Sequence, residues 1–382
     1  MSKPIDHVGA LSAEIGTRGT ATHGEEQGAH YAAQVLQSLG YQVEEQVFRT
    51  VPTFSWVYLV LYLLPAVALA TSFFSRPTAA IIAVLAAVVF FLELNTVEVV
   101  SRLLPKQQSR NVVAHRPALC ESPKRQVVLV AHVDTSKAAL NFSPQMVKGF
   151  RTSFLLMVLS MAAVAILALL RFWLFTPILL WLQLPFVLYL LVTAGFLLHR
   201  ENWNRYTEGA NDNASGVGIV LALAEQMRRQ APNLDLWCLI TGAEEAGTFG
   251  MIRFLEQRGR DFRDAHFLNL DNVGAGTFHF MSGEGMFPTW KSAAPLLELC
   301  QQVRDEHPEL GVKQGVYNLM STDALPALAR GYRAISFLAV DEVGLLPNWH
   351  WLSDTYENVE EGTLNQGQQF VAHLMQRLDQ QA

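Results

Sequence analysis

Four long apolar stretches, grouped in two pairs, limit what this chain can fold into more than any other feature. They are residues 54–74, 77–92, 152–170 and 172–198. Only Ser75 and Arg76 interrupt the first pair, and only Arg171 interrupts the second. A helix needs about 20 apolar residues to cross the hydrocarbon core of a bilayer, so each stretch is close to one span. Buried helices of a soluble core are the alternative, but tryptophan and tyrosine near several ends favour the membrane. The sequence therefore predicts two transmembrane hairpins, 54–94 and 152–198, of two spans each.

Positive charges beside these stretches predict their orientation, because cytoplasmic loops are enriched in lysine and arginine. The polar flanks carry Arg49, Arg102, Lys106, Arg110, Lys148, Arg151, Arg200 and Arg205. The two tight turns carry only Arg76 and Arg171. Since each hairpin crosses twice, the polar segments 1–53, 95–151 and 199–382 emerge on one side, where they can form one domain. We expect an integral protein of a bacterial-type inner membrane, with this domain in the cytoplasm and no secretory signal peptide.

Composition agrees with a lipid partner and argues against nucleic acid. Hydrophobic residues make up 51% of the 382 residues and charged residues 16%. The formal charge is −6 and the lysines and arginines are scattered, so no nucleic-acid surface is expected. Cys120, Cys238 and Cys300 are far apart and form no C-x-x-C motif. We therefore expect neither a disulfide framework nor a thiolate metal site, and a reducing compartment fits best.

Without the hairpins, the polar segments alternate between helix and strand. The expected helices are 26–39, 214–229 and 247–258, and the expected strands are 127–131, 234–241, 266–270 and 333–340. Such alternation predicts an α/β fold with a mostly parallel, mixed sheet covered by helices on both sides.

Residues of the types that bind metals follow three of these strands. The first strand runs into His132 and Asp134, the second into Glu244 and Glu245, and the third into Asp271. Ligands of open parallel sheets bind outside the carboxyl ends of the strands, so these side chains are expected at one edge. In addition, Asp212 lies in the glycine- and asparagine-rich segment GANDNASG, and His350 lies between two tryptophans in NWHWLSDT.

Each of these residues has an ordinary structural interpretation. Asp212 could cap the helix that follows it, Glu244 and Glu245 could be a solvated pair, and Asp271 could be a turn residue. His350 could belong to a half-buried aromatic cluster. Their occurrence together at successive strand ends is what favours a metal site. Carboxylate and imidazole ligands suit zinc or a related divalent ion, and the sequence has no H-E-x-x-H, no G-x-S-x-G and no phosphate-binding loop.

The ordered motifs AHVDT, GANDNASG, GAEEAG, NLDNVG and WHWLSDT resemble those of metallopeptidase family 28, the co-catalytic zinc peptidases that include aminopeptidases and glutamate carboxypeptidases. The resemblance implies a zinc-exopeptidase-like fold and two metal ions, most simply zinc. In this family's pattern Asp212 bridges the two ions, His132 and Asp271 complete one site, and Glu245 and His350 complete the other. Glu244 is then the general base, and Asp134 orients His132. The resemblance also implies a cis peptide bond after Asp212, and it leaves the role of Asp323 open because Ala324 stands where relatives often have a histidine or an aromatic residue.

The expected protein is a membrane-anchored exopeptidase, an aminopeptidase, that hydrolyses peptide or aminoacyl substrates with a water shared by two zinc ions and with Glu244 as base. Two alternatives remain open at this stage. One is an acyltransferase like the glutaminyl cyclases, which resemble the chain and work with one zinc. The other is a non-catalytic membrane scaffold or binding protein. A transporter is disfavoured because Glu93, near one end of a span, is the only acidic residue of the hairpins. The sequence does not indicate the oligomeric state or the preferred side chain of the substrate.

Overall fold

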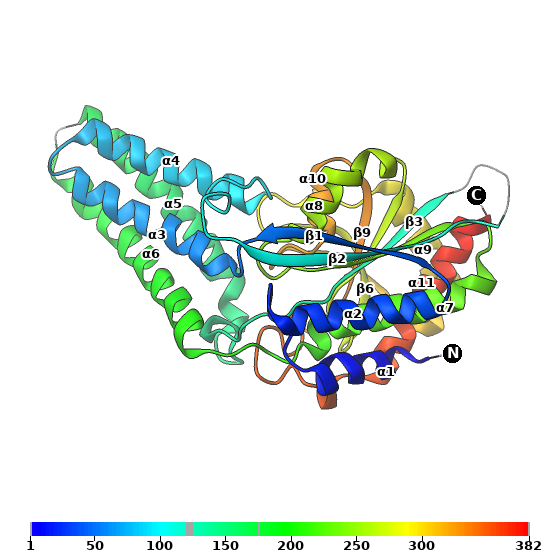
Figure 1. Cartoon of the computed structure of the whole chain (residues 1–382). Helices are drawn as coiled ribbons and strands as arrows, with labels where there is room; N and C mark the ends of the chain where they lie inside the picture. The colour runs from blue at the N-terminus through cyan, green and yellow to red at the C-terminus, as the bar shows by residue number, and fades with distance from the viewer. Residues whose placement is uncertain (1, 120–124, 175, 381–382) are drawn as a thin grey trace. The chain divides into compact units, whose positions relative to one another are not determined.

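A mixed β-sheet organises the polar part of the chain in the computed structural model, which describes residues 2–119, 125–174 and 176–380 (Figure 1). Its strands are β1 (Gln42–Thr50), β2 (Gln107–Arg116), β3 (Gln126–His132), β4 (Asp235–Thr241), β5 (His266–Leu270), β6 (Thr277–Glu284), β7 (Trp290–Lys291), β8 (Lys313–Tyr317) and β9 (Arg333–Val340). The order is β1-β2-β4-β3-β5-β9-β6-β7, and β8 pairs with β6. The neighbouring strands β4, β3, β5 and β9 are parallel, whereas β1, β2, β6 and β7 are antiparallel to their neighbours on this path. The predicted mixed α/β fold is therefore confirmed.

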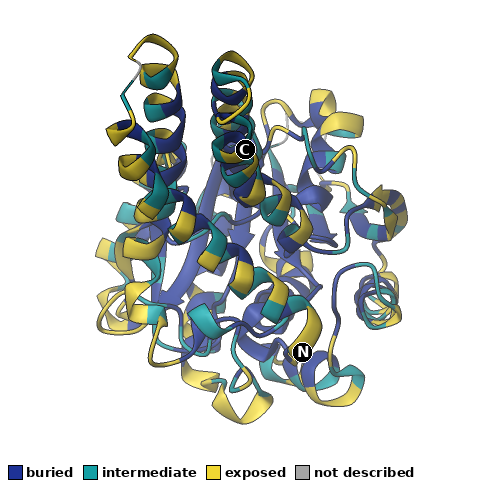
Figure 2. Ribbon diagram, turned by 90° about the vertical axis from the view of Figure 1, so that its left-hand side faces the viewer, coloured by how far each residue is buried: buried dark blue, intermediate teal, exposed yellow. Residues whose placement is uncertain are grey.

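Burial on both faces explains why the central strands are apolar throughout. In β3, Val127, Leu129 and Ala131 belong to one hydrophobic core, and Val128 and Val130 belong to another. Successive side chains of a strand point to opposite faces, so this alternation places one core on each side of the sheet. Figure 2 shows the strands as buried elements in the interior.

Helices cover each face of the sheet. The larger core is formed with α1 (Pro4–Val8), α2 (His23–Ser38), α7 (Ser215–Gln230), α9 (Ala294–Glu306) and α11 (Glu361–Gln380). The smaller core is formed with α8 (Phe249–Arg258) and α10 (Ala324–Ala329). Short helical turns lie at η1 (Gly9–Ile15), η2 (Leu140–Phe142), η3 (Val147–Gly149), η4 (Ala210–Ala214), η5 (Gly259–Phe262), η6 (Pro308–Leu310) and η7 (Tyr356–Asn358).

The chain divides into two compact units. The first comprises Met1–Pro52, Lys106–Lys137 and Tyr206–Ala382, and the second comprises Thr53–Pro105 and Ala138–Arg205. Cys238 and Cys300 are buried free cysteines of the first unit, while Cys120 lies outside the described residues.

Four helices of the second unit are long and apolar enough to cross a membrane, by length and composition. They are α3 (Phe54–Thr71), α4 (Arg76–Leu94), α5 (Phe150–Trp173) and α6 (Ile178–Trp203). Their interior is built largely of small residues, among them Ala68, Ala83 and Ala168. Large aliphatic side chains point outward instead, and Ile81 and Val192 are 59% and 60% exposed. This is the reverse of a helical bundle in water, whose exposed faces are polar.

Candidate metal centre

Three parallel strands bring predicted ligands to one edge of the sheet. Strand β3 ends at His132, the turn after β4 carries Glu244 and Glu245, and Asp271 directly follows β5. Because β4, β3 and β5 are adjacent and parallel, their carboxyl ends lie together. The carboxyl edge of the sheet therefore supplies three of the five expected ligands as well as the expected base.

Loops supply the other two ligands. Asp212 lies in η4, directly before α7, and the peptide bond between Asp212 and Asn213 is cis, as expected. His350 lies in the segment between β9 and α11, where its φ of 45° places it in the left-handed region. Such a backbone conformation is unfavourable for a residue with a Cβ atom, so the surrounding structure must hold it. Both side chains are buried.

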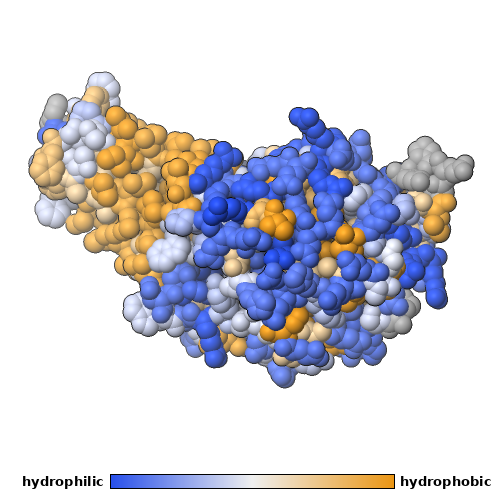
Figure 3. All heavy atoms as spheres, in the orientation of Figure 1, coloured by the Kyte–Doolittle hydropathy of each residue, from blue (hydrophilic) through white to orange (hydrophobic). Residues whose placement is uncertain are grey.

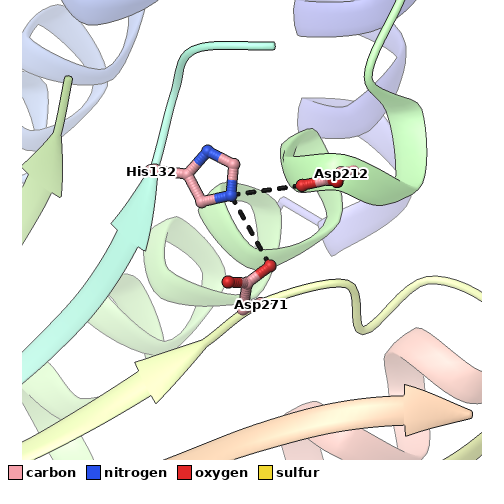
Figure 4. Close-up of side chains that lie close together, drawn as sticks. All are labelled: His132, Asp212 and Asp271. Carbon is pink, nitrogen blue, oxygen red and sulfur yellow. Dashed lines mark ion pairs between the residues drawn. The ribbon is translucent and has the colours of Figure 1, made fainter. Parts of the chain in front are cut away.

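The five side chains form two groups that share Asp212. His132, Asp212 and Asp271 make one group, and Asp212, Glu245 and His350 make the other; in each, one ligand atom per residue lies within 4.8 Å of the others. His132 Nε2 lies 3.2 Å from Asp212 Oδ1 and 3.5 Å from Asp271 Oδ1. Figure 4 shows these three side chains pointing toward one another. His350 Nε2 lies 3.1 Å from both Asp212 Oδ2 and Glu245 Oε2. Each oxygen of Asp212 thus faces a different histidine.

The donor set fits a pair of divalent cations. Imidazole nitrogens and carboxylate oxygens converge in a buried site, which is the ligand chemistry of zinc. One oxygen of Glu245, Oε1, is buried and has no hydrogen-bond partner among the residues that the structure describes. A buried acceptor without a partner is costly, and a cation would satisfy it. The charges also favour bound cations. The four carboxylates of Asp212, Glu244, Glu245 and Asp271 carry more negative charge than two imidazoles can balance.

Burial and the neighbouring charges shift the pKa values of these groups, upward for His132 and Glu244 and downward for Asp212. Burial tends to lower the pKa of His132, but Glu244 and Asp271 outweigh it and hold that pKa well above its ordinary value. Burial tends to raise the pKa of Asp212, but hydrogen bonds with His132 and His350 outweigh it and lower the pKa. Burial raises the pKa of Glu244 well above the ordinary value for a glutamate. The groups are strongly coupled, as expected for charges crowded in a dry site.

Asp134 lies beside His132 and also contacts the turn that carries both glutamates. His132 Nδ1 lies 3.1 Å from the backbone carbonyl of Asp134 and 3.6 Å from its carboxylate. The carboxylate itself accepts hydrogen bonds from the backbone N–H groups of Glu244 (3.1 Å) and Glu245 (3.2 Å) and from the hydroxyl of Thr20 (2.6 Å). Asp134 therefore ties the end of β3 to the turn that carries both glutamates.

Two further side chains fix the turn that carries Asp212. The carboxylate of Asp354 accepts from the backbone N–H groups of Asn211 (2.6 Å) and Asp212 (3.1 Å). The side chain of Asn213 accepts from the backbone N–H of Gly216 (2.9 Å) and donates to the carbonyl of Leu270 (2.9 Å). Through Asn213 the start of α7 is attached to the end of β5, next to Asp271.

The sequence assigned no role to Asp323 and did not single out Tyr317. Asp323 is buried; one carboxylate oxygen accepts from the hydroxyl of Thr241 and the other has no hydrogen-bond partner. Burial raises its pKa to about 7. Tyr317, at the end of β8, is 4% exposed, and burial together with Asp271, Asp212 and Glu244 raises its pKa well above the ordinary value. No motif marks Tyr317, which the pairing of β8 with β6 places opposite Glu284.

Comparison with known proteins shows which family part of the chain resembles. Residues 192–375 match the model of peptidase family M28. This part of the chain is therefore similar to peptidase family M28. The M28 match includes Asp212, Glu244, Glu245, Asp271 and His350, whereas His132 precedes it.

Solved structures show the same fold. BSAP, a zinc aminopeptidase from Bacillus subtilis, has a TM-score of 0.59 at 14% identity, over 97% of this chain and 93% of that one. A glutaminyl cyclase from Bacteroides thetaiotaomicron has a TM-score of 0.59 at 17% identity, over 98% and 96%. A leucine aminopeptidase precursor from Bacteroides thetaiotaomicron has a TM-score of 0.58 at 17% identity, over 98% and 95%. No curated protein matches the chain in sequence. The chain thus shares its fold with peptidases and with cyclases.

Proposed function

We propose that this chain is a membrane-anchored aminopeptidase that uses two divalent metal ions, zinc in the simplest case. The observation that carries the proposal is the pair of ligand groups that share Asp212. One ion would be held by His132, Asp212 and Asp271, and the other by Asp212, Glu245 and His350. When bound, such a pair of ions would lower the pKa of a water molecule held between them and polarise the scissile carbonyl.

Glu244 is the proposed general base. It is not a member of either ligand group, yet its carboxylate lies 4.0 Å from His132 Nε2, at the margin of the ligand set. A carboxylate there takes a proton from the attacking water and delivers it to the leaving amine, so hydrolysis needs no covalent intermediate.

The charges around the centre favour a substrate with a free α-amine. Beyond the ligands and Glu244, the acids Asp134, Asp323 and Asp354 are buried in the same region. Arg18 is the nearby cation, but its guanidinium already donates to backbone carbonyls. Seven acidic side chains, those of Asp134, Asp212, Glu244, Glu245, Asp271, Asp323 and Asp354, would still outnumber the four charges of two divalent ions and the one of Arg18, so an ammonium group would be favoured over a carboxylate. We therefore favour aminopeptidase over carboxypeptidase activity.

Membrane anchoring rests on the second unit of the chain. Its four helices expose large aliphatic side chains, and Figure 3 shows hydrophobic atoms covering them. Aromatic side chains are exposed near the helix ends, including Phe74 (92%), Trp173 (72%) and Trp203 (73%). Aromatic residues at both ends of apolar helices are typical of spans that end in the lipid headgroup region. The four helices are proposed to anchor the peptidase domain to a bacterial-type inner membrane, on the cytoplasmic side.

The direct test uses protein purified in detergent, loaded with zinc, and a series of aminoacyl p-nitroanilides. Wild-type protein should release p-nitroaniline, and N-acetylated versions of the same compounds should be poor substrates because they lack the free amine. Glu244→Gln should retain bound zinc but lower kcat by about 10²- to 10⁴-fold, since it removes the general base. Glu256→Gln, a change of an exposed glutamate on α8, is the matched control and should be fully active. Full activity of Glu244→Gln would refute its assignment as base.

Glutaminyl cyclase activity is the second candidate, because cyclases share the fold. A cyclase would convert a peptide with N-terminal glutamine to its pyroglutamyl form and release ammonia, with no hydrolysis of aminoacyl p-nitroanilides. One zinc per chain together with that product would favour the cyclase. About two zinc ions per chain together with amide hydrolysis would favour the peptidase.

A further inference from the structure

One short segment near the N-terminus, residues 17–25, contacts three of the loops that carry the proposed metal ligands and base, namely those of His132, Asp212 and Glu244–Glu245. It contains none of the ligands, and it lies outside the part of the chain that matches the family model. Three of its side chains, Arg18, Thr20 and Glu25, make these contacts, and each is buried. Side chains this far from the ligands in sequence are placed here only by the fold.

Arg18 joins the loop after His132 to the loop before Asp212. Its Nε donates to the carbonyl of Val133 and its Nη2 to the carbonyl of Gly209, each at 2.8 Å. Its Nη1 lies 2.8 Å from the carbonyls of Leu11, Gly16 and Glu208. The guanidinium is completely buried, and its hydrogen bonds within the described part of the chain all go to backbone oxygens. It therefore fixes the spacing of two loops, at the residue after His132 and at the third residue before Asp212.

Burying a guanidinium is costly unless its charge is compensated. Burial lowers the pKa of Arg18 to about 10, so it remains charged at neutral pH. The compensating charges are the carboxylates of Asp354, Asp134 and Asp212, which favour the charged form without touching it. Arg18 in turn offsets part of the negative charge that these acids place around the centre.

Thr20 acts on the same centre through Asp134. Its hydroxyl donates to Asp134 Oδ2 at 2.6 Å, and the backbone of the segment is attached to the same loop by hydrogen bonds between Arg18 and Thr135. Asp134 accepts from the N–H groups of Glu244 and Glu245. The hydroxyl of Thr20 thus fixes the rotamer of the carboxylate that positions the base and one ligand.

Glu25 is hydrogen-bonded to the turn after β4, at the residue that precedes Glu244. Its Oε1 accepts from the backbone N–H of Ala243 at 2.9 Å and from the hydroxyl of Ser109 at 3.0 Å. Ala243 directly precedes Glu244 and has a φ of 55°, which is unfavourable for a residue with a Cβ atom and must be held by its surroundings. Glu25 is part of those surroundings.

We propose that Arg18, Thr20 and Glu25 are positioning residues of the metal centre, which set the spacing of the His132, Asp212 and Glu244–Glu245 loops for binding two ions. This inference rests on the proposed function and adds residues that neither the motifs nor the family match assign. The contacts fix the ligands before a metal arrives. Loss of one contact should therefore lower the zinc affinity clearly, while the unfolding temperature of the metal-free protein changes little.

The sharpest test replaces the hydroxyl of Thr20 with a methyl group and shortens the reach of Arg18. Thr20→Val and Arg18→Lys are compared with two matched controls. Thr363→Val removes another buried hydroxyl that donates to a carboxylate, that of Glu360 (2.9 Å). Arg116→Lys changes another arginine that donates to a backbone carbonyl, that of Ala231 (3.0 Å). Zinc affinity is measured by competition with a chelator, kcat and KM with an aminoacyl p-nitroanilide, and stability by thermal unfolding of the metal-free protein.

Thr20→Val and Arg18→Lys should bind zinc about 10- to 100-fold more weakly, as is usual when a residue that orients a ligand is lost. At saturating zinc they should lower kcat with little change in KM, because the base is displaced while substrate contacts remain. The controls should bind zinc and turn over as the wild type does. Zinc affinity and kcat equal to wild type in both test variants would overturn the inference, and so would losses that merely follow the fall in unfolding temperature. If Arg18→Lys fails to fold, Thr20→Val decides.

The same experiment separates this inference from the proposed function. Wild-type protein that binds zinc but hydrolyses no aminoacyl amide would refute the aminopeptidase, while the zinc affinities would still test the positioning residues. An active wild type with unchanged zinc affinity in Thr20→Val and Arg18→Lys would refute only the positioning role. Wild-type protein that binds no zinc would contradict both.

Discussion

At the scale of single residues, four aspartates of similar burial have different tasks because of what surrounds them. Asp212 offers one oxygen to each histidine, whereas Asp271 lies in only one ligand group. Asp134 and Asp354 accept backbone N–H groups and hold loops instead. The number of backbone donors that reach a carboxylate therefore decides whether its oxygens remain available to a metal. We infer that ligands and supports in this site are distinguished by hydrogen bonding and not by residue type.

Glu284 provides a residue-scale prediction on pH. It is buried, and burial raises its pKa from an ordinary 4.5 to about 7, even though Thr322 and Ser336 donate to it. Because the folded pKa lies above the unfolded one, the stabilisation is complete below about pH 4.5 and is lost as the pH rises through about 7. The loss is on the order of 3 kcal/mol. Glu284→Gln should remove this dependence.

The measurement is the unfolding temperature of metal-free wild type and Glu284→Gln between pH 4.5 and 7.5. The wild type should lose stability relative to the variant as the pH rises. Two curves that stay parallel over this interval would show that Glu284 is ionised in the folded protein throughout.

At the scale of elements, close packing of α7 against β5 holds Asp212 beside Asp271. A Cβ atom added at Gly216 would lie 2.3 Å from the carbonyl oxygen of Leu270 and 2.4 Å from Asn213 Oδ1. Gly216→Ala should therefore push the start of α7 away from the end of β5. We expect zinc to bind at least about 10-fold more weakly, as with other losses of ligand orientation.

Gly362→Ala is the matched control, since a Cβ atom there meets nothing within 4 Å. It should bind zinc as the wild type does, and its helix α11 should be stabilised slightly by the loss of a glycine. Zinc affinities that are equal in the two alanine variants would contradict the role assigned to the contact between α7 and β5.

Much of the fold and of the site could be predicted, because both follow from local patterns. The alternating helices and strands gave the parallel strands β3, β4, β5 and β9, and the strand-end rule indicated His132 and Asp271, which the structure brings together. The strands β6, β7 and β8 were not predicted, although β6 begins with the alternation Thr277, Phe278, His279, Phe280. Arg18, Thr20 and Tyr317 were also missed. Arg18 is hydrogen-bonded to Val133, which is 115 positions away in the sequence, and Thr20 to Asp134, which is 114 positions away. No local motif encodes such contacts.

At the scale of the whole molecule, the chain should cross the membrane twice in α3 and α4 and twice in α5 and α6. The segments before, between and after these two hairpins should therefore lie on a single side of the membrane. A reporter enzyme fused at the C-terminus should be active only in the cytoplasm, and so should one inserted at Gly40, in the turn between α2 and β1. Reporters inserted in the turns after Phe74 or after Leu174 should be active only on the opposite side. The physical reason is the excess of Lys and Arg on the flanks relative to these turns.

Reporters in both turns that behave like the C-terminal fusion would show that the helices do not cross the membrane. In that case the exposed aliphatic side chains of α3 to α6 would need another partner.

The central claim is that two buried ligand groups sharing Asp212 each hold a metal ion. Elemental analysis of zinc in protein purified without added chelator tests it most directly, in wild type, Asp271→Asn and His350→Ala. The wild type should contain about two zinc ions per chain, and each variant, which damages one ligand group and spares the other, should contain about one. A wild type with one zinc or none, or variants that keep the full wild-type content, would contradict it.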